Sequence, residues 1–275
     1  MRYFISVDME GISGIVDGSM VSNKQHDYEK GRKLMVEDVN AAIRGILASD
    51  PKAEITVCDA HGSMNNINPT DLNKAARLVR GTPKPQSQMS TLDSSFDACL
   101  FIGYHSKKGT LHGVMSHTYS GGNIESLHVN DIEVGETQLN AGIAGHYDVP
   151  LIFLSGDQAT CKEANAINQQ ITTAKVKTAI GRTAATCLHP DAAHELITEG
   201  VKAAIKNIDK IKPHKVKTPV TFKIRFTDAK RADAAALIPT TTLLDGKTIQ
   251  LTAPDYITAY HGFIAAVLCG TAVSA

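Results

Sequence analysis

Four short apolar runs within the first 155 residues constrain the fold of this chain more than any other feature. The runs are Tyr3–Val7, Ile55–Cys58, Ala98–Gly103 and Val149–Ser155. Short segments that are apolar throughout, rather than alternating, are typical of parallel strands that are buried on both faces. We therefore predict that these four segments are buried strands of one mainly parallel sheet.

Helical patterns lie between some of these runs. The clearest covers residues 28–47, and a second helix is expected from Glu136 to His146. The apolar stripe of the first helix, at helical spacing, consists of Val39, Ala42, Ile43, Ile46 and Leu47. Strands that alternate with helices favour an α/β fold, in which helices cover a mainly parallel sheet.

The pattern changes after residue 171. Expected strands now lie at 176–180, 220–226 and 248–252, and expected helices at 191–208, 230–237 and 256–268. We therefore expect an α/β domain over residues 1–171 and a smaller α+β domain over residues 172–275. The sequence leaves open whether the last helix packs back on the first domain.

Composition and charge argue against several classes of partner. Lys+Arg and Asp+Glu both number 28, so the formal net charge is zero, and we expect no nucleic-acid partner. No apolar run approaches the ~18 residues of a membrane span, and the N-terminal run is cut short by Asp8, so neither a membrane partner nor a secretory signal is expected. The five cysteines contain no CxxC pair and indicate reduced thiols in a cytoplasmic protein.

Polar side chains follow each of the four apolar runs. They are Asp8 and Glu10, Asp59 and His61, His105, and Asp157. Ligands of an open parallel sheet bind at the carboxyl ends of its strands, so residues far apart in the sequence are brought to one edge. A charged group there is costly unless it is paired or bound to a metal.

Asp8 and Glu10 suggest what this edge binds. Side chains two apart on an extended chain point the same way, and two close carboxylates repel unless a cation lies between them. Taken singly, the acidic pair fits a solvated turn, and His61 and His105 fit ordinary loop or core histidines. Together they indicate a metal site. Imidazoles and carboxylates without a thiolate suit zinc, or else manganese or cobalt.

The roles of four nearby residues stay open when only the residue types and their spacing are considered. Asp59 either orients His61 or caps its own turn. Asp157 either lines the pocket or caps a helix. Glu136 by its spacing is a favourable acid at a helix N-terminus. His117, in a loop flanked by glycines, is either a catalytic group or an ordinary loop histidine.

Several segments resemble a known family. The run Ser6-Val7-Asp8-Met9-Glu10-Gly11 is similar to the SxDxEG signature of the zinc D-aminopeptidases that are encoded with bacterial dipeptide-transport genes. Further similar segments follow in the same order, namely 59–61, 103–105, 114–117, 134–136 and 145–150. The resemblance extends over essentially the whole chain.

The resemblance implies more than the residues alone. It implies two Zn²⁺ per subunit, with Asp8, Glu10, His61, His105 and Glu136 as the ligands. It places His117 at the position of a catalytic histidine, described in the family as a nucleophile; with metal-activated water available, we favour acid/base work. It also implies release of N-terminal D-amino acids, notably D-alanine, from short peptides, and a ring-shaped homo-oligomer of the decamer type.

Two other functions share these features. A different two-metal hydrolase, such as an amidase or phosphatase, can use the same cluster. A phosphatase would usually add arginine, lysine or a phosphate-binding glycine loop, which the site motifs lack. A peptide-binding protein is the second alternative, but it has little use for converging carboxylates and histidines with a further loop histidine. The sequence therefore favours a zinc metallo-aminopeptidase.

Overall fold

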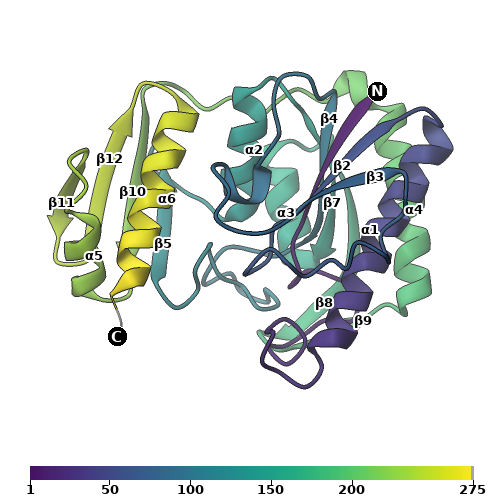
Figure 1. The fold of residues 1–275 in the computed structure, drawn as a ribbon, viewed down its shortest axis with the longest axis horizontal. Helices are drawn as coiled ribbons and strands as arrows, with labels where there is room; N and C mark the ends of the chain where they lie inside the picture. The colour runs from purple at the N-terminus through teal and green to yellow at the C-terminus, as the bar shows by residue number, and fades with distance from the viewer. Residues whose placement is uncertain (274–275) are drawn as a thin grey trace.

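The computed structural model describes residues 1–273. It contains two β-sheets, and the larger of them has seven strands (Figure 1). The strands are β1 (Arg2–Val7), β2 (Glu54–Asp59), β3 (Ala76–Val79), β4 (Ala98–Tyr104), β7 (Leu151–Asp157), β8 (Thr172–Gly181) and β9 (Ala184–Cys187). Their order is β3-β2-β1-β4-β7-β8-β9, and every pair is parallel except β8 with β9. The expectation of a mainly parallel sheet is confirmed.

Helices cover both faces of this sheet. Helices α1 (Tyr28–Ser49) and α4 (Pro190–Lys206) pack together on one side, whereas α2 (Glu136–His146) and α3 (Gln158–Ile167) lie on the other (Figure 1). The strands between them are apolar on both faces, and every residue of β4 and β7 is buried. This burial explains why these strands read as continuous apolar runs.

A five-stranded antiparallel sheet forms the other end of the molecule (Figure 1). Its strands are β5 (Ile124–Val129), β6 (Ile132–Glu133), β10 (Val220–Phe226), β11 (Thr241–Asp245) and β12 (Thr248–Ala253), in the order β11-β12-β10-β5-β6. Helices α5 (Ala229–Ala235) and α6 (Tyr256–Ala272) pack on it. From α6, the hydroxyl of Tyr256 donates a hydrogen bond of 2.8 Å to the carbonyl of Leu139 in α2.

The two sheets exchange segments across the expected domain boundary. Strands β8 and β9 and helix α4 come after residue 171 but belong to the first sheet, while β5 and β6 come before it and belong to the second. The division into domains at this residue stays a prediction. Within residues 1–273, no helix is long and apolar enough to cross a membrane.

The loop after β1 is held tightly against its neighbours. The backbone N–H of Gly11 donates to the carbonyl of Gly103 at 2.8 Å, and a Cβ at Gly11 would lie 1.9 Å from the carbonyl oxygen of Tyr104. The absence of a side chain at Gly11 therefore permits close approach to β4. From β8, the buried Lys177 ammonium donates to the carbonyls of Glu10, Ile12 and Ile15, and burial lowers its pKa to about 8.

We expect Gly11→Ala to lower the free energy of unfolding by about 1–3 kcal/mol, because the new methyl group has no space beside β4. Urea unfolding measures the change. Gly18→Ala, in the same loop, is the matched control because a Cβ there meets nothing within 4 Å. Equal stability of the two variants would contradict the role given to Gly11.

Candidate metal centre

The five residues expected to bind metal lie together at the carboxyl ends of the central strands. Asp8 and His105 directly follow β1 and β4, and His61 lies two residues after β2. Glu10 is two residues beyond Asp8, and Glu136 is the first residue of α2. Four of the five are buried, and the side chain of His61 is 13% exposed.

Asp8 occupies the middle of this cluster because its two oxygens contact different histidines. Its Oδ1 lies 3.1 Å from His61 Nδ1, and its Oδ2 lies 3.3 Å from His105 Nε2. The same His61 nitrogen is 3.0 Å from Glu10 Oε2, and the same His105 nitrogen is 3.2 Å from Glu136 Oε1. One carboxylate therefore joins two carboxylate–imidazole pairs.

The donor atoms of the cluster fit a divalent cation. Glu10 Oε2 and His105 Nε2 are buried, yet neither forms a hydrogen bond with any group in residues 1–273. Two sets of ligand atoms each lie within 4.8 Å of one another, namely Asp8, Glu10 and His105, and His105, His117 and Glu136. Nitrogen and carboxylate donors without thiolate suit zinc and its neighbours. A cation would satisfy buried polar atoms that the protein leaves unsatisfied.

Each of the three histidines is oriented by a backbone carbonyl. His61 Nε2 lies 2.9 Å from the carbonyl of Val21, and His105 Nδ1 lies 3.0 Å from the carbonyl of Ser106. His117 Nδ1 lies 2.9 Å from the carbonyl of Met115. Because a carbonyl only accepts hydrogen bonds, each of these nitrogens must carry a proton, and the opposite nitrogen faces the carboxylates. Histidines that bind metals are commonly held in this way.

The opposite charges in the cluster outweigh the effect of burial. Burial raises the pKa of Glu10, but the positive charge of the adjacent His61 brings this pKa well below its usual range. Burial lowers the pKa of His61, but Glu10 and Asp8 raise it well above the usual range. In the same way, His105 lowers the pKa of Glu136 to about 2. A bound cation would have to displace the imidazole protons that neutralise these acids.

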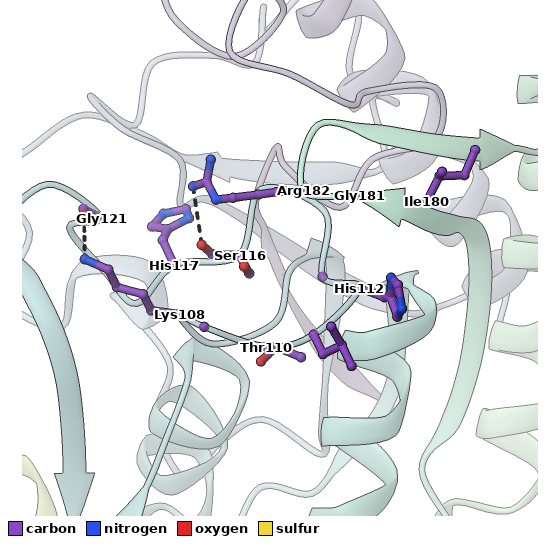
Figure 2. A pocket seen from close by; sticks show the side chains of 12 residues that line it. Lys108, Thr110, His112, Ser116, His117, Gly121, Ile180, Gly181 and Arg182 are labelled. Atoms are coloured by element: carbon purple, nitrogen blue, oxygen red, sulfur yellow. Dashed lines mark hydrogen bonds between the residues drawn. The ribbon is translucent and has the colours of Figure 1, made fainter.

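His117 reaches the cluster from the loop between β4 and β5. Its ring stacks on His105, with centroids 4.0 Å apart and an interplanar angle of 12°, and its Nε2 is 3.7 Å from Glu136 Oε1. Its side chain is 18% exposed and lines a cavity of about 690 Å³ (Figure 2). The structure thus places His117 between the buried cluster and an open cavity.

Two acids that the sequence left open have structural partners. Asp59 accepts hydrogen bonds from the backbone N–H groups of Asn66 and Ile67, so it caps the turn that follows β2. Asp157 caps α3 and also accepts a hydrogen bond of 2.6 Å from the N–H of Val114. The second contact anchors the loop that carries His117.

Sequence reasoning missed the residues that position Glu136. The side-chain amide of Gln88 donates to Glu136 Oε2, and the backbone N–H of Tyr119 donates to Oε1 at 2.6 Å. The side-chain amide of Asn140 in turn donates to the side-chain oxygen of Gln88. Gln88 lies in a 3₁₀ turn, Ser87–Met89, that has no periodic pattern, so nothing in the local sequence indicates its role.

Comparison with known proteins identifies the family of this chain and a similar curated protein. The sequence matches the D-aminopeptidase family over residues 1–265, so the chain belongs to this family of peptidases and is a hydrolase, as expected. A curated relative, the D-aminopeptidase of Bacillus subtilis (strain 168), is 39% identical over 265 residues, which cover 96% of each protein.

A solved structure extends the likeness to three dimensions. It is described as the Zn-dependent D-aminopeptidase DppA from Bacillus subtilis, a self-compartmentalizing protease. The two chains superpose with a TM-score of 0.96 at 38% identity, and the match covers 100% of both. The expected α/β fold and family are confirmed.

Proposed function

We propose that this chain is a zinc-dependent aminopeptidase that releases N-terminal D-amino acids of the D-alanine type from short peptides. The observation that carries this proposal is the buried cluster, in which Asp8 contacts two histidines that each have a further carboxylate partner. The zinc dependence printed for DppA, at 38% identity over the whole chain, supports the metal.

Two zinc ions per subunit match this arrangement. Asp8, Glu10 and His61 would hold one ion, and Asp8, His105 and Glu136 the other, because Asp8 is the carboxylate that both halves share. When bound, such ions polarise a carbonyl group and lower the pKa of a coordinated water to about 7. Gln88 and the backbone of Tyr119 fix the orientation of Glu136 for this task.

His117 is our candidate for proton transfer. Its Nδ1–H donates to the carbonyl of Met115, which leaves Nε2 free to accept a proton on the cluster side. The nearby Glu136 carboxylate would stabilise the imidazolium that results, and the proton could then pass to the leaving amine. In this role His117 acts as a general acid and base, not as a nucleophile.

The assembly and location are part of the same proposal. DppA is described as self-compartmentalizing, which supports a homo-oligomer, and we propose a ring of the decamer type for this chain. The five cysteines form no disulfide with one another in residues 1–273, and three of them are buried. Reduced thiols of this kind support action in the cytoplasm.

We expect Glu10→Ala and His105→Ala to lose bound zinc, because each removes a buried ligand atom that has no hydrogen-bond partner in the described chain. Elemental analysis of the purified variants measures zinc per subunit. The control is His112→Ala, which changes a loop histidine outside both groups of ligand atoms. Full zinc occupancy in both ligand variants would rule out this ligand assignment.

His117→Ala should retain zinc but lose turnover by roughly 10²–10⁴-fold, the range typical of a lost general acid or base. Steady-state kinetics and elemental analysis together separate this effect from loss of metal. A near-normal kcat would show that His117 is not required for proton transfer. Loss of zinc would instead make it a ligand, which its place beside His105 and Glu136 permits.

The wild-type protein should release alanine from D-alanyl dipeptides faster than from L-alanyl dipeptides, and a chelator should stop the release. A coupled assay for each free amino acid measures both rates, and p-nitrophenyl phosphate tests the phosphatase alternative. Chelator-sensitive hydrolysis of the phosphate ester alone would refute the peptidase assignment. Binding of peptides without release would favour a peptide-binding protein.

A further inference from the structure

The cavity beyond His117 is built by two segments that lie far apart in the sequence (Figure 2). One is the loop from Lys108 to His117, together with Gly121, and the other is the end of β8 with the first residue of the turn to β9, at residues 180–182. Because His117 lines both this cavity and the cluster, the cavity is the open route towards the proposed metals.

The cavity is positively charged. Among the residues that line it are Lys108 and Arg182, and none is acidic. The Lys108 ammonium already donates to the carbonyls of Gly121 and Ile124, at 2.9 and 2.8 Å. Within residues 1–273 the Arg182 side chain makes one hydrogen bond, a long one of 3.4 Å to the carbonyl of Ser116, and no ion pair. Most of its guanidinium donors are therefore available.

Arg182 is nevertheless held in place. Its backbone carbonyl accepts a hydrogen bond of 2.7 Å from the N–H of Met115, two residues before His117. In Figure 2 its side chain extends from the β8–β9 turn over Ser116, on the side of the cavity where His117 lies. The tip of the hairpin and the loop of the candidate catalytic histidine are thus fixed to each other.

We propose that Arg182 binds the C-terminal carboxylate of the peptide substrate, an inference that rests on the proposed function. A peptide whose amino end lies at the cluster and whose scissile bond lies beside His117 must extend into this cavity. Successive Cα atoms are 3.80 Å apart, so the carboxylate of a dipeptide or tripeptide lies only one or two such steps beyond the scissile bond. The Arg182 guanidinium lies at this short range, because it contacts the carbonyl of Ser116, the neighbour of His117. A guanidinium recognises a carboxylate through two parallel hydrogen bonds. Arg182 therefore selects short peptides with a free carboxyl end.

The kinetic test compares D-alanyl-D-alanine with its C-terminal amide. For Arg182→Gln we expect the KM of the free acid to rise roughly tenfold with kcat nearly unchanged, since a charged hydrogen bond from this exposed side chain contributes equally to ground-state and transition-state binding. The KM of the amide should not change. Added salt should raise the KM of the acid alone, because the contact is screened. Arg182→Lys should recover part of the loss.

The matched control is Arg77→Gln, on the exposed side of β3 at the opposite edge of the sheet, which should leave both substrates unaffected. If Arg182→Gln weakens acid and amide equally, its effect is structural and the proposal is overturned. The same holds if the wild-type protein does not prefer the acid.

A binding measurement separates this proposal from the proposed function. Both peptides are titrated calorimetrically into zinc-loaded His117→Ala and into the His117→Ala, Arg182→Gln double variant. Tighter binding of the acid that disappears in the double variant supports the carboxylate site, even if the wild-type protein releases no amino acid and the peptidase assignment fails. Equal affinity for acid and amide in the first variant overturns the carboxylate site, whatever the turnover.

Discussion

Mutual neutralisation of buried charges at the ends of β1, β2 and β4 is the constraint on which the rest of the structure depends. Asp8 and Glu10 cannot both be ionised in an apolar interior without positive partners, and His61 and His105 supply them. The surrounding structure serves this arrangement. Gly11 lets the loop after β1 approach β4, and the ring nitrogens remote from the carboxylates are tied to backbone carbonyls.

Much of the fold could be predicted because burial leaves a direct pattern in the sequence. Strands β1, β2, β4 and β7 read as apolar runs since both of their faces are covered, and the predicted bounds of α2 agree with the structure. Strand β3 has no fully buried residue, and β5 includes the exposed Glu125, so neither carries such a pattern. Helix α3 begins directly after β7 with no intervening loop to signal it.

The residues of the site likewise fall into those that the sequence could predict and those that it could not. The rule that ligands collect at the carboxyl ends of parallel strands located Asp8, Glu10, His61 and His105 in advance, and the structure brings them together. Glu136 came from family resemblance. Gln88 and Arg182 could not be found, because the contacts that give them a role arise only when segments distant in the sequence pack together. Their own neighbours in the sequence show no motif.

Strand β8 links the two ends of the site. Lys177, near its middle, holds the loop that carries Glu10, and Arg182 follows the strand's last residue. The spacing between the loop of Glu10 and the far wall of the cavity is therefore set by the constant rise of an extended strand. A change in the number of residues between Lys177 and Arg182 would therefore alter the preferred length of peptide, while the residues of the cluster stay the same.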